Sequence, residues 1–314
     1  MTIDKKIRPI IIAGPTAVGK TEYTIRLAEE FNGEIVSCDS MQLYKYMDIG
    51  SAKPTKEERQ RIPHHLIDVI DPSEKFSVAK YYEMAKSAIE DIDRRGKVPF
   101  VTGGTGLYIN SLIYDMDFSV PPQKDEKIRD KYINLAEEKG REYVYAILEN
   151  MNPQVASRIH PNNLQKVVRA IEAEELGESI GDFSKDPKPN EIFDPILICF
   201  TRNREELYDR INRRGDILFD MGLVNEVKSL MDMGLDESNI SMKGIGYKEV
   251  IRYIKGEITL EEAIELVKKS SRHYAKRQLT WFRRYDKMKW FNISDYKNDE
   301  LFLEDVSTWL RNQL

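Results

Sequence analysis

The sequence predicts an α/β protein, built on a doubly wound parallel sheet with a helical insertion and a helical C-terminal region. Three observations predict this fold. The apolar run Ile10–Ala13 leads into a glycine-rich turn, AGPTAVGKT (13–21), and then into a helical pattern. Apolar runs of strand length alternate with helical stretches up to residue 106, which is typical of parallel sheets. Residues 125–176 are helical in pattern throughout.

The glycine-rich turn has the spacing of a phosphate-binding loop. Gly14, Gly19, Lys20 and Thr21 fit G-x-x-x-x-G-K-S/T, with a strand before and a helix after. In such a loop, backbone N–H groups and the helix N-terminus attract an anion, and the lysine reaches phosphate oxygens. We therefore expect a P-loop-type fold, with an ordinary strand–helix turn as the alternative. The residues expected to bind a diphosphate or nucleotide are Gly14, Pro15, Thr16, Ala17, Val18, Gly19, Lys20 and Thr21.

The elements that follow bring polar residues to the ends of predicted strands. The expected elements are a helix from about Lys20 to Phe31, a strand at Glu34–Cys38, a helix from about Val78 to Arg95 and a strand at Val98–Thr102. In a doubly wound sheet, ligands lie at the carboxyl ends of the strands. The phosphate-binding loop, Asp39 and Thr105 are therefore all expected at that edge.

A helical insertion is expected to interrupt the sheet domain. Pro121-Pro122 marks a break, and the polar stretch Gly177–Asn190 closes the helical region. Ile196–Thr201 again has the pattern of a buried strand. Residues 121–190 are thus expected to be an insertion in a core of residues 1–120 and 191–314. Apolar residues at three- and four-residue spacing from Leu260 to Tyr285 predict one long helix in the C-terminal region.

Composition is that of a soluble globular protein, and we expect the protein in the cytoplasm. The chain has 314 residues, of which 41% are hydrophobic and 32% charged. No apolar stretch approaches the length of a membrane span, and MTIDKKIRP at the N-terminus has no apolar segment of the kind that directs export. Cys38 and Cys199 lie far apart, which fits a reducing compartment and no structural zinc, and Cys38 is expected to be a small buried strand residue. We expect a monomer without membrane contact.

A basic segment stands out against the net charge of −5. From Lys268 to Lys289 there are nine Lys and Arg residues and one acid, Asp286. Aromatic residues alternate with the cations in HYAKRQLTWFRRYDK (273–287). A core stripe beside a solvated helix face would give the same pattern, but the shortage of acids favours contact with a nucleic-acid backbone.

Asp39 begins the segment DSMQLYKYMDIGSAKP (39–54), and two interpretations of it remain open. In a nucleotidase with a phosphate-binding loop, a strand-end Asp holds Mg²⁺ together with a residue such as Thr21. Alternatively, Asp39 is a general base acting on a bound acceptor. Its neighbours favour the second interpretation, because Ser40 and Gln42 suit the edge of a nucleobase and Tyr44 offers a stacking face.

Thr105 and two arginines are further candidates. Thr105 follows two glycines at a strand end, so it is either a helix cap or a ligand to a substrate phosphate or base. Arg210 and Arg214 are one helical turn apart and share a face. They are either solvated or clamp a diphosphate, since guanidinium groups bind phosphate oxygens in pairs.

Motifs along nearly the whole chain resemble the tRNA dimethylallyltransferases of the isopentenyltransferase group. They are GPTAVGKT (14–21), DSMQLYKYMDIGSAKP (39–54), GGTGLY (103–108), RIHPNN and LQKVVRA (158–170), Arg210 to Gly222, KGIGYKE (243–249) and AKRQLTWFR (275–283). Lys166 departs from the family's QRxxR pattern, which puts a bidentate base contact in doubt there. The zinc finger of eukaryotic relatives is absent, which points to the bacterial form.

The resemblance implies a reaction and a set of residues. The loop would bind dimethylallyl diphosphate, with Mg²⁺ held by Thr21, and the prenyl group would pass to the exocyclic amine of the adenine on the 3′ side of the anticodon. The tRNAs would be those reading codons that begin with U, and the insertion would hold the anticodon stem-loop. The expected catalytic residues are Asp39, Thr105, Arg210 and Arg214. The expected tRNA-binding residues are Asp39, Ser40, Met41, Gln42, Thr105, Arg129, Gln165, Lys166, Arg169, Lys243, Gly244, Ile245, Gly246, Tyr247, Lys248, Lys276, Arg277, Gln278, Trp281 and Arg283.

Three other functions fit the sequence less well. An adenylate isopentenyltransferase, acting on free AMP or ATP, needs neither the insertion nor the basic segment. A P-loop kinase is disfavoured because no arginine-rich lid or acceptor motif of that class is visible. A non-catalytic RNA-binding protein does not need Asp39 beside an intact phosphate-binding loop.

Overall fold

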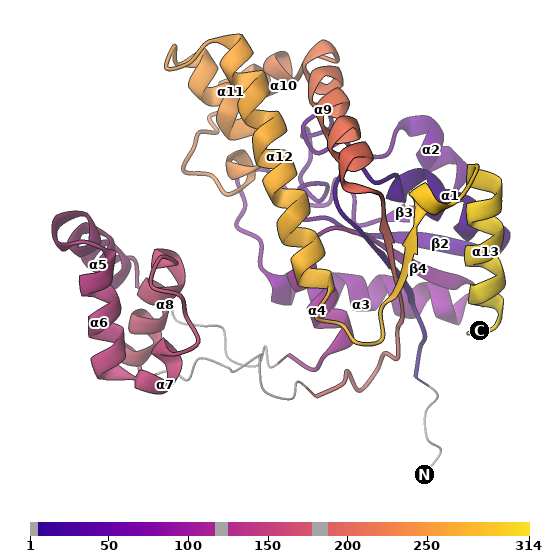
Figure 1. The fold of residues 1–314 in the computed structure, drawn as a ribbon, viewed down its shortest axis with the longest axis horizontal. Coiled ribbons are helices and arrows are strands. Elements are labelled where there is room, and N and C mark those ends of the chain that lie inside the picture. The colour runs from indigo at the N-terminus through magenta and orange to yellow at the C-terminus, as the bar shows by residue number, and fades with distance from the viewer. Residues whose placement is uncertain (1–5, 117–124, 178–187) are drawn as a thin grey trace. The chain divides into compact units, whose positions relative to one another are not determined.

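The computed structural model describes residues 6–116, 125–177 and 188–314. The chain divides into two compact units, one made of residues 1–115 and 189–314 and the other of residues 116–188 (Figure 1). The expected boundaries were 121 and 190. Pro121-Pro122 and most of the polar stretch Gly177–Asn190 lie outside the described residues.

The larger unit contains a parallel sheet. In the described part of the chain its six strands follow the order β3-β2-β4-β1-β5-β6. Their bounds are β1 Ile10–Ala13, β2 Gly33–Cys38, β3 His64–His65, β4 Val98–Gly103, β5 Ile196–Thr201 and β6 Lys289–Asn292. Ala13 at the end of β1 pairs with Gly103 of β4 and Cys199 of β5, so the carboxyl ends of the three central strands meet at one edge. The doubly wound α/β fold expected from the sequence is confirmed.

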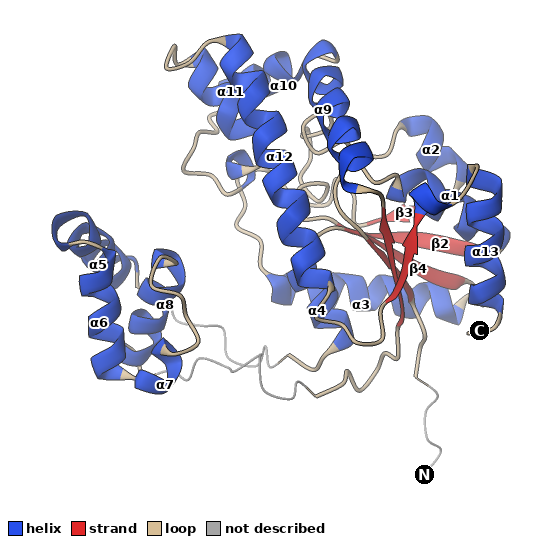
Figure 2. Ribbon diagram, viewed as in Figure 1, coloured by secondary structure: helices blue, strands red, loops and turns tan. Residues whose placement is uncertain are grey.

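Helices cover both faces of this sheet (Figure 2). Alternate strand residues pack into two cores: Ile11, Val36 and Val101 face α3 (Val78–Arg94) and α4 (Gly106–Ile113). Ile10 and Ile12 face the other core, with α1 (Lys20–Glu30) and α13 (Asp299–Arg311). This two-residue alternation explains why the strands are apolar at nearly every position.

The C-terminal part adds helices beside the sheet. They are α9 (Arg204–Asp220), α10 (Leu223–Asp232), α11 (Tyr247–Ile254) and α12 (Leu260–Phe282), with 3₁₀ turns at Ser241–Lys243 and Ile293–Asp295. A capping box between Thr259 and Glu262 begins α12. The helix was expected to reach Tyr285 but ends at Phe282, because the chain turns there toward β6. The short helix α2 (Lys56–Arg61) follows β2.

The smaller unit is helical in its described part. It contains α5 (Glu126–Lys139), α6 (Arg141–Met151), α7 (Pro153–Ala156) and α8 (Leu164–Glu175). Val144, Leu148, Val167 and Ile171 are fully buried in a core of its own. Across both units, no described helix is long and apolar enough to cross a membrane.

Candidate active site

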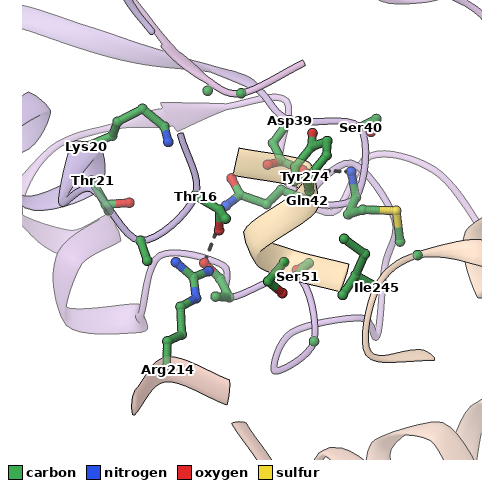
Figure 3. Close-up of a pocket in the computed structure, with 18 of the residues that line it drawn as sticks. Thr16, Lys20, Thr21, Asp39, Ser40, Gln42, Ser51, Arg214, Ile245 and Tyr274 are labelled. Carbon is green, nitrogen blue, oxygen red and sulfur yellow. Dashed lines mark hydrogen bonds between the residues drawn. The ribbon is translucent and has the colours of Figure 1, made fainter. Parts of the chain in front are cut away.

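A pocket of about 540 Å³ opens at the carboxyl ends of β1, β2 and β4. This volume suits a small organic ligand. Figure 3 shows Lys20 and Thr21 on one side of the pocket and Asp39, Ser40 and Gln42 on another, with Arg214 pointing toward it from α9. Groups from the phosphate-binding loop and from the segment after β2 therefore share one space.

The phosphate-binding loop folds tightly around Lys20. The Lys20 ammonium donates to the carbonyls of Gly14 (2.9 Å) and Pro15 (2.8 Å). Gly19 has a φ of 109°, which favours glycine, and a Cβ on Gly14 would lie 2.7 Å from the Phe200 carbonyl oxygen. The two glycines of the motif are thus required by conformation and by close approach.

Lys20 is held in an environment that disfavours its charge. Burial lowers the pKa of Lys20 to about 8, the Asp39 carboxylate opposes this shift, and the nearby Arg214 cation adds to it. Burial likewise lowers the pKa of Arg214. A bound anion would relieve both groups, so this side of the pocket is poised to accept negative charge.

Two arginines and a glutamine support the loop from behind. Arg210 Nε donates to the Ala17 carbonyl (2.9 Å) and Arg202 Nε to the Val18 carbonyl (3.0 Å). Gln278 Oε1 accepts from the Thr16 amide (2.9 Å). Arg214 lines the pocket, whereas Arg210 uses its Nε on the loop backbone, so the two arginines expected to act as a pair do different things.

Sequence reasoning did not single out Arg202. Its side chain is only 9% exposed and also donates through Nη2 to the Tyr23 hydroxyl (3.0 Å). The residue directly follows the predicted strand Ile196–Thr201. That position, at the edge where ligands lie, is the sequence feature that could have identified it.

Asp39 and Thr105 meet at the ends of β2 and β4. Asp39 lines the pocket, and its Oδ1 accepts from the Met41 amide (2.8 Å). Thr105 occupies the N-cap position of α4, but its hydroxyl accepts from the Ser40 amide (3.0 Å) instead of capping the helix. Thr105 thus fixes the backbone directly after Asp39.

Gln42 is oriented by two hydrogen bonds. Its Oε1 accepts from the Ser37 hydroxyl (3.0 Å) and its Nε2 donates to the Ala52 carbonyl (3.4 Å). The expectation for Tyr44 is wrong: it is 3% exposed and packs in the core, so its ring offers no stacking face. Tyr274 of α12 lines the pocket instead, and burial, followed by the Asp39 charge, raises its pKa.

The segment Lys243–Lys248 contributes to the pocket through some of its residues. The pocket is lined by Lys243, Gly244, Ile245 and Lys248. Tyr247 is fully buried and donates its hydroxyl to Glu226 (2.8 Å), and Gly246 has a φ of 98°. Gly246 and Tyr247 therefore shape the turn that carries the four pocket-lining residues of this segment.

The basic segment 268–289 also contains both exposed residues and residues that pack against the rest of the unit. Lys276, Arg277 and Arg283 are exposed, and Arg277 lines the pocket with its guanidinium 5.6 Å from the Tyr274 ring centre. Gln278 is buried and donates to the Gly104 carbonyl (3.0 Å), in addition to its bond with the Thr16 amide. Trp281 lies against Gly106, where a Cβ would approach its ring to 2.4 Å. Gln278 and Trp281 anchor α12, whereas the three cations are exposed.

In the helical unit, the residues expected to bind tRNA differ in how far their side chains are free to contact it. Gln165, Lys166 and Arg169 are exposed on α8. Arg129 forms a close ion pair with the buried Glu172, through Nε (2.9 Å) and Nη2 (2.7 Å). Its guanidinium is therefore already engaged within the unit. Among the described residues of the chain, no three His, Cys, Asp or Glu side chains gather in a way that could hold a metal ion.

Comparison with known proteins identifies the family. Residues 42–285 match the model of the family described as IPP transferase. The chain is 55% identical to a tRNA dimethylallyltransferase of Alkaliphilus oremlandii over 96% of both chains. It also resembles the crystal structure of a tRNA isopentenylpyrophosphate transferase from Bacillus halodurans, with a TM-score of 0.74 and 41% identity over 98% of this chain and 96% of that one.

A second solved structure agrees. The tRNA delta(2)-isopentenylpyrophosphate transferase of Staphylococcus epidermidis is 42% identical, with a TM-score of 0.72 over 98% of this chain and 100% of that one. The resemblance drawn from the sequence motifs is confirmed. The chain belongs to the IPP transferase family, the family of the tRNA dimethylallyltransferases.

Proposed function

We propose that this protein transfers a dimethylallyl group from dimethylallyl diphosphate to the exocyclic amine of an adenine in tRNA, and releases diphosphate. The adenine is the one on the 3′ side of the anticodon, in tRNAs that read codons beginning with U. One observation carries the proposal within the family: the phosphate-binding loop with Lys20 and the strand-end carboxylate of Asp39 line the same pocket.

The donor binds at the phosphate-binding loop. Lys20 and Arg214 face the leaving diphosphate, and the backbone amides at the start of α1 have no partners within the helix. Negative charge develops on the leaving group as its C–O bond breaks. Cations and amides held at that point stabilise the transition state more than the ground state.

A magnesium ion fits this donor half. Mg²⁺ takes oxygen ligands and is usually bound by one or two protein groups together with substrate phosphates and water. The Thr21 hydroxyl lines the pocket and is the group that would hold the ion, which leaves the Asp39 carboxylate free to act as the base. When bound, the ion would neutralise charge on the diphosphate.

The acceptor is activated by Asp39. An adenine amine is a poor nucleophile, so its proton must leave as the new C–N bond forms. Asp39 accepts that proton, and the electron pair of the breaking C–O bond departs with diphosphate. The base must leave the anticodon loop to reach the pocket, where Gln42 and the segment Lys243–Lys248 would read its edges.

The tRNA backbone is bound by exposed cations and one exposed amide side chain, and Arg277 among them also lines the pocket. In the larger unit these are Lys276, Arg277 and Arg283, and in the helical unit Gln165, Lys166 and Arg169 take the corresponding role. Both halves of the pocket belong to one chain, so we propose that the protein acts as a monomer, in the cytoplasm where its substrate is made.

One experiment tests this function against its rivals. The protein is incubated with dimethylallyl diphosphate labelled in the prenyl group, with Mg²⁺ and with either tRNA or AMP. We expect label on tRNA alone, without added ATP. Label on AMP would favour an adenylate isopentenyltransferase, and a strict requirement for ATP would favour a kinase. A tRNA lacking the adenine next to the anticodon is the matched control and should stay unlabelled.

A further inference from the structure

A single carboxylate holds three consecutive backbone amides beside the pocket. Glu226 Oε2 accepts from the amides of Asp48 (2.8 Å) and Ile49 (2.7 Å), and its Oε1 accepts from the amide of Gly50 (3.0 Å). The Tyr247 hydroxyl also donates to Oε1 (2.8 Å). Glu226 comes from α10, almost 180 residues further along the chain, so it fastens the segment 48–50 to a distant part of the fold.

The segment 48–50 continues into Ala52, which is hydrogen-bonded to the side chain of Gln42. Within it, the Ala52 amide donates to the Ile49 carbonyl (2.9 Å), and the Ala52 carbonyl accepts from Gln42 Nε2 (3.4 Å). Gly50, Ser51 and Ala52 line the pocket. The position of Gln42 therefore depends on a loop whose own amides are held by Glu226.

The same carboxylate is connected to the opposite wall. Tyr247 packs against Gly50, where a Cβ would lie 2.5 Å from its ring, and its ring also lies 3.2 Å from the Cβ position of Gly244. Gly244 and Ile245 line the pocket. Through Tyr247, Glu226 thus sets the separation between the segment 50–52 and the turn 244–245.

We propose that Glu226 is a positioning residue that fixes the width of the acceptor side of the pocket, so that Gln42 and the turn 244–245 close on one unstacked base. This inference rests on the proposed function. Three adjacent amides form a concave surface that attracts anions, and Glu226 occupies it from within the protein. These three amides are thereby unavailable to phosphate groups, and the acceptor side is held at a fixed width.

The test replaces Glu226 by Gln, which keeps the size of the side chain. An amide group carries only one acceptor oxygen, so at least one of the bonded amides loses its partner. We expect turnover at saturating tRNA and dimethylallyl diphosphate to fall on the order of tenfold to a hundredfold, since the base is no longer held in place. The dissociation constants of both substrates should stay within about twofold, because phosphate contacts dominate both.

Two variants complete the design. Tyr247→Phe removes one of the four hydrogen bonds that Glu226 accepts and should lower turnover severalfold. This variant tests the proposal if Glu226→Gln does not fold. Glu237→Gln removes an exposed carboxylate paired with Lys255 in the same unit and should leave turnover unchanged. Turnover is calculated per site that binds dimethylallyl diphosphate, so that unfolded protein is not counted.

The outcomes separate positioning from mere stability. A lower melting temperature with unchanged turnover per binding site would overturn the proposal, and so would an equal loss of affinity for dimethylallyl diphosphate. If the wild-type protein fails to label tRNA at all, the proposed function fails first, and the failure is visible without any variant. Labelling by the wild type with full turnover in Glu226→Gln contradicts this inference alone.

Discussion

The two loops that form the pocket are supported by side chains of opposite polarity. Donor groups of Lys20, Arg202 and Arg210 reach carbonyl oxygens of the phosphate-binding loop. In the segment 48–50, an acceptor, the Glu226 carboxylate, reaches the backbone amides. Gln278 is an exception, because its Oε1 accepts from the Thr16 amide of the phosphate-binding loop. The other contacts named here reach carbonyl oxygens in the phosphate-binding loop and amides in the segment 48–50.

This difference decides what each loop can bind. A loop whose carbonyls are held from behind can turn its amides toward a ligand, which suits an anion. A loop whose amides are held presents its carbonyls and side chains, which suits the donor groups of a neutral base. Lys20 and Arg214 line the pocket at the first loop, and the neutral side chains of Ser40 and Gln42 line it at the second, although Lys243 and Lys248 also lie on that side. Under the proposed function, the phosphate-binding loop would be the donor half of the pocket, and the segments 40–52 and 243–248 its acceptor half.

Asp39 stands between the two halves, and removing its charge should give the largest effect. Asn keeps the size of the side chain and an oxygen for the Met41 amide, but it cannot take a proton. We expect Asp39→Asn to lower turnover by about 10²–10⁴, the usual loss for a general base, while tRNA affinity changes little. Rapid-quench transfer assays measure the rate. A near-normal rate at saturating Mg²⁺ would contradict the assignment of Asp39 as the base.

Lys20 provides a test confined to the donor half. Because burial lowers its pKa to about 8, the free site loses its cation as the pH rises above that value. A bound diphosphate favours the charged amine and raises its pKa, so binding above pH 8 should take up a proton. We expect affinity for dimethylallyl diphosphate to fall as the pH rises from 8 to 10, and Lys20→Met to weaken binding by about 10- to 100-fold at pH 7.

Calorimetry in buffers of different ionisation enthalpy measures the uptake directly. In Lys20→Met the dependence on pH above 8 should largely disappear, while tRNA affinity remains as in the wild type. Proton uptake that persists unchanged in the variant would mean that another group titrates. A similar loss of tRNA affinity would break the division of the pocket into two halves.

Arg202 sharpens the comparison, because its hydrogen bond to the loop is made to a carbonyl, that of Val18. Replacing it by Met removes a charged donor from Val18 and Tyr23 and the ion-pair partner of Glu206, and should raise the KM for dimethylallyl diphosphate by about tenfold. Arg213→Met is the matched control: it lies nearby on α9, is 66% exposed and pairs only with Asp209 among the described contacts. Such surface pairs contribute little. Steady-state kinetics with saturating tRNA measure the change, and an unchanged KM would show that the loop holds its shape without Arg202.

The sequence was most informative where structure depends on neighbours in the chain. The central strands are apolar runs bounded by turn residues, and the phosphate-binding loop follows from two glycines whose conformations and contacts allow no side chain. Asp39 and Thr105 could be brought together because parallel strands end at one edge. These elements were predicted with their positions nearly correct.

Contacts between distant segments could not be predicted in this way. Arg202 reaches a carbonyl 184 residues earlier in the chain, and Glu226 reaches amides 176 to 178 residues earlier. No local spacing indicates such pairs. Tyr44 was expected to offer a stacking face to a base, yet it packs in the core. The strand β6 was missed because Lys289–Asn292 is short and continues the basic segment.

The smallest effect is expected from the exposed cations of α12 and the turn after it. If Arg277 and Arg283 contact the tRNA backbone, tRNA affinity should fall steeply with salt, with a slope of about −0.7 per neutralised phosphate for single-stranded RNA. Replacing both by Ala should weaken binding alike for different tRNAs and flatten the slope by roughly one unit per lost contact. Affinity for dimethylallyl diphosphate should barely change.

Measuring the slope together with the melting temperature distinguishes contact from support, because the two arginines are exposed while their neighbours Gln278 and Phe282 are buried. Arg277 also lies over the Tyr274 ring, so part of its loss could appear as lower stability. Arg283→Ala alone separates these contributions, since Arg283 faces solvent at the end of α12. A stable double variant with an unchanged salt slope would show that Arg277 and Arg283 do not belong to the tRNA-binding surface. Binding of tRNA would then have to depend on the other residues proposed for it.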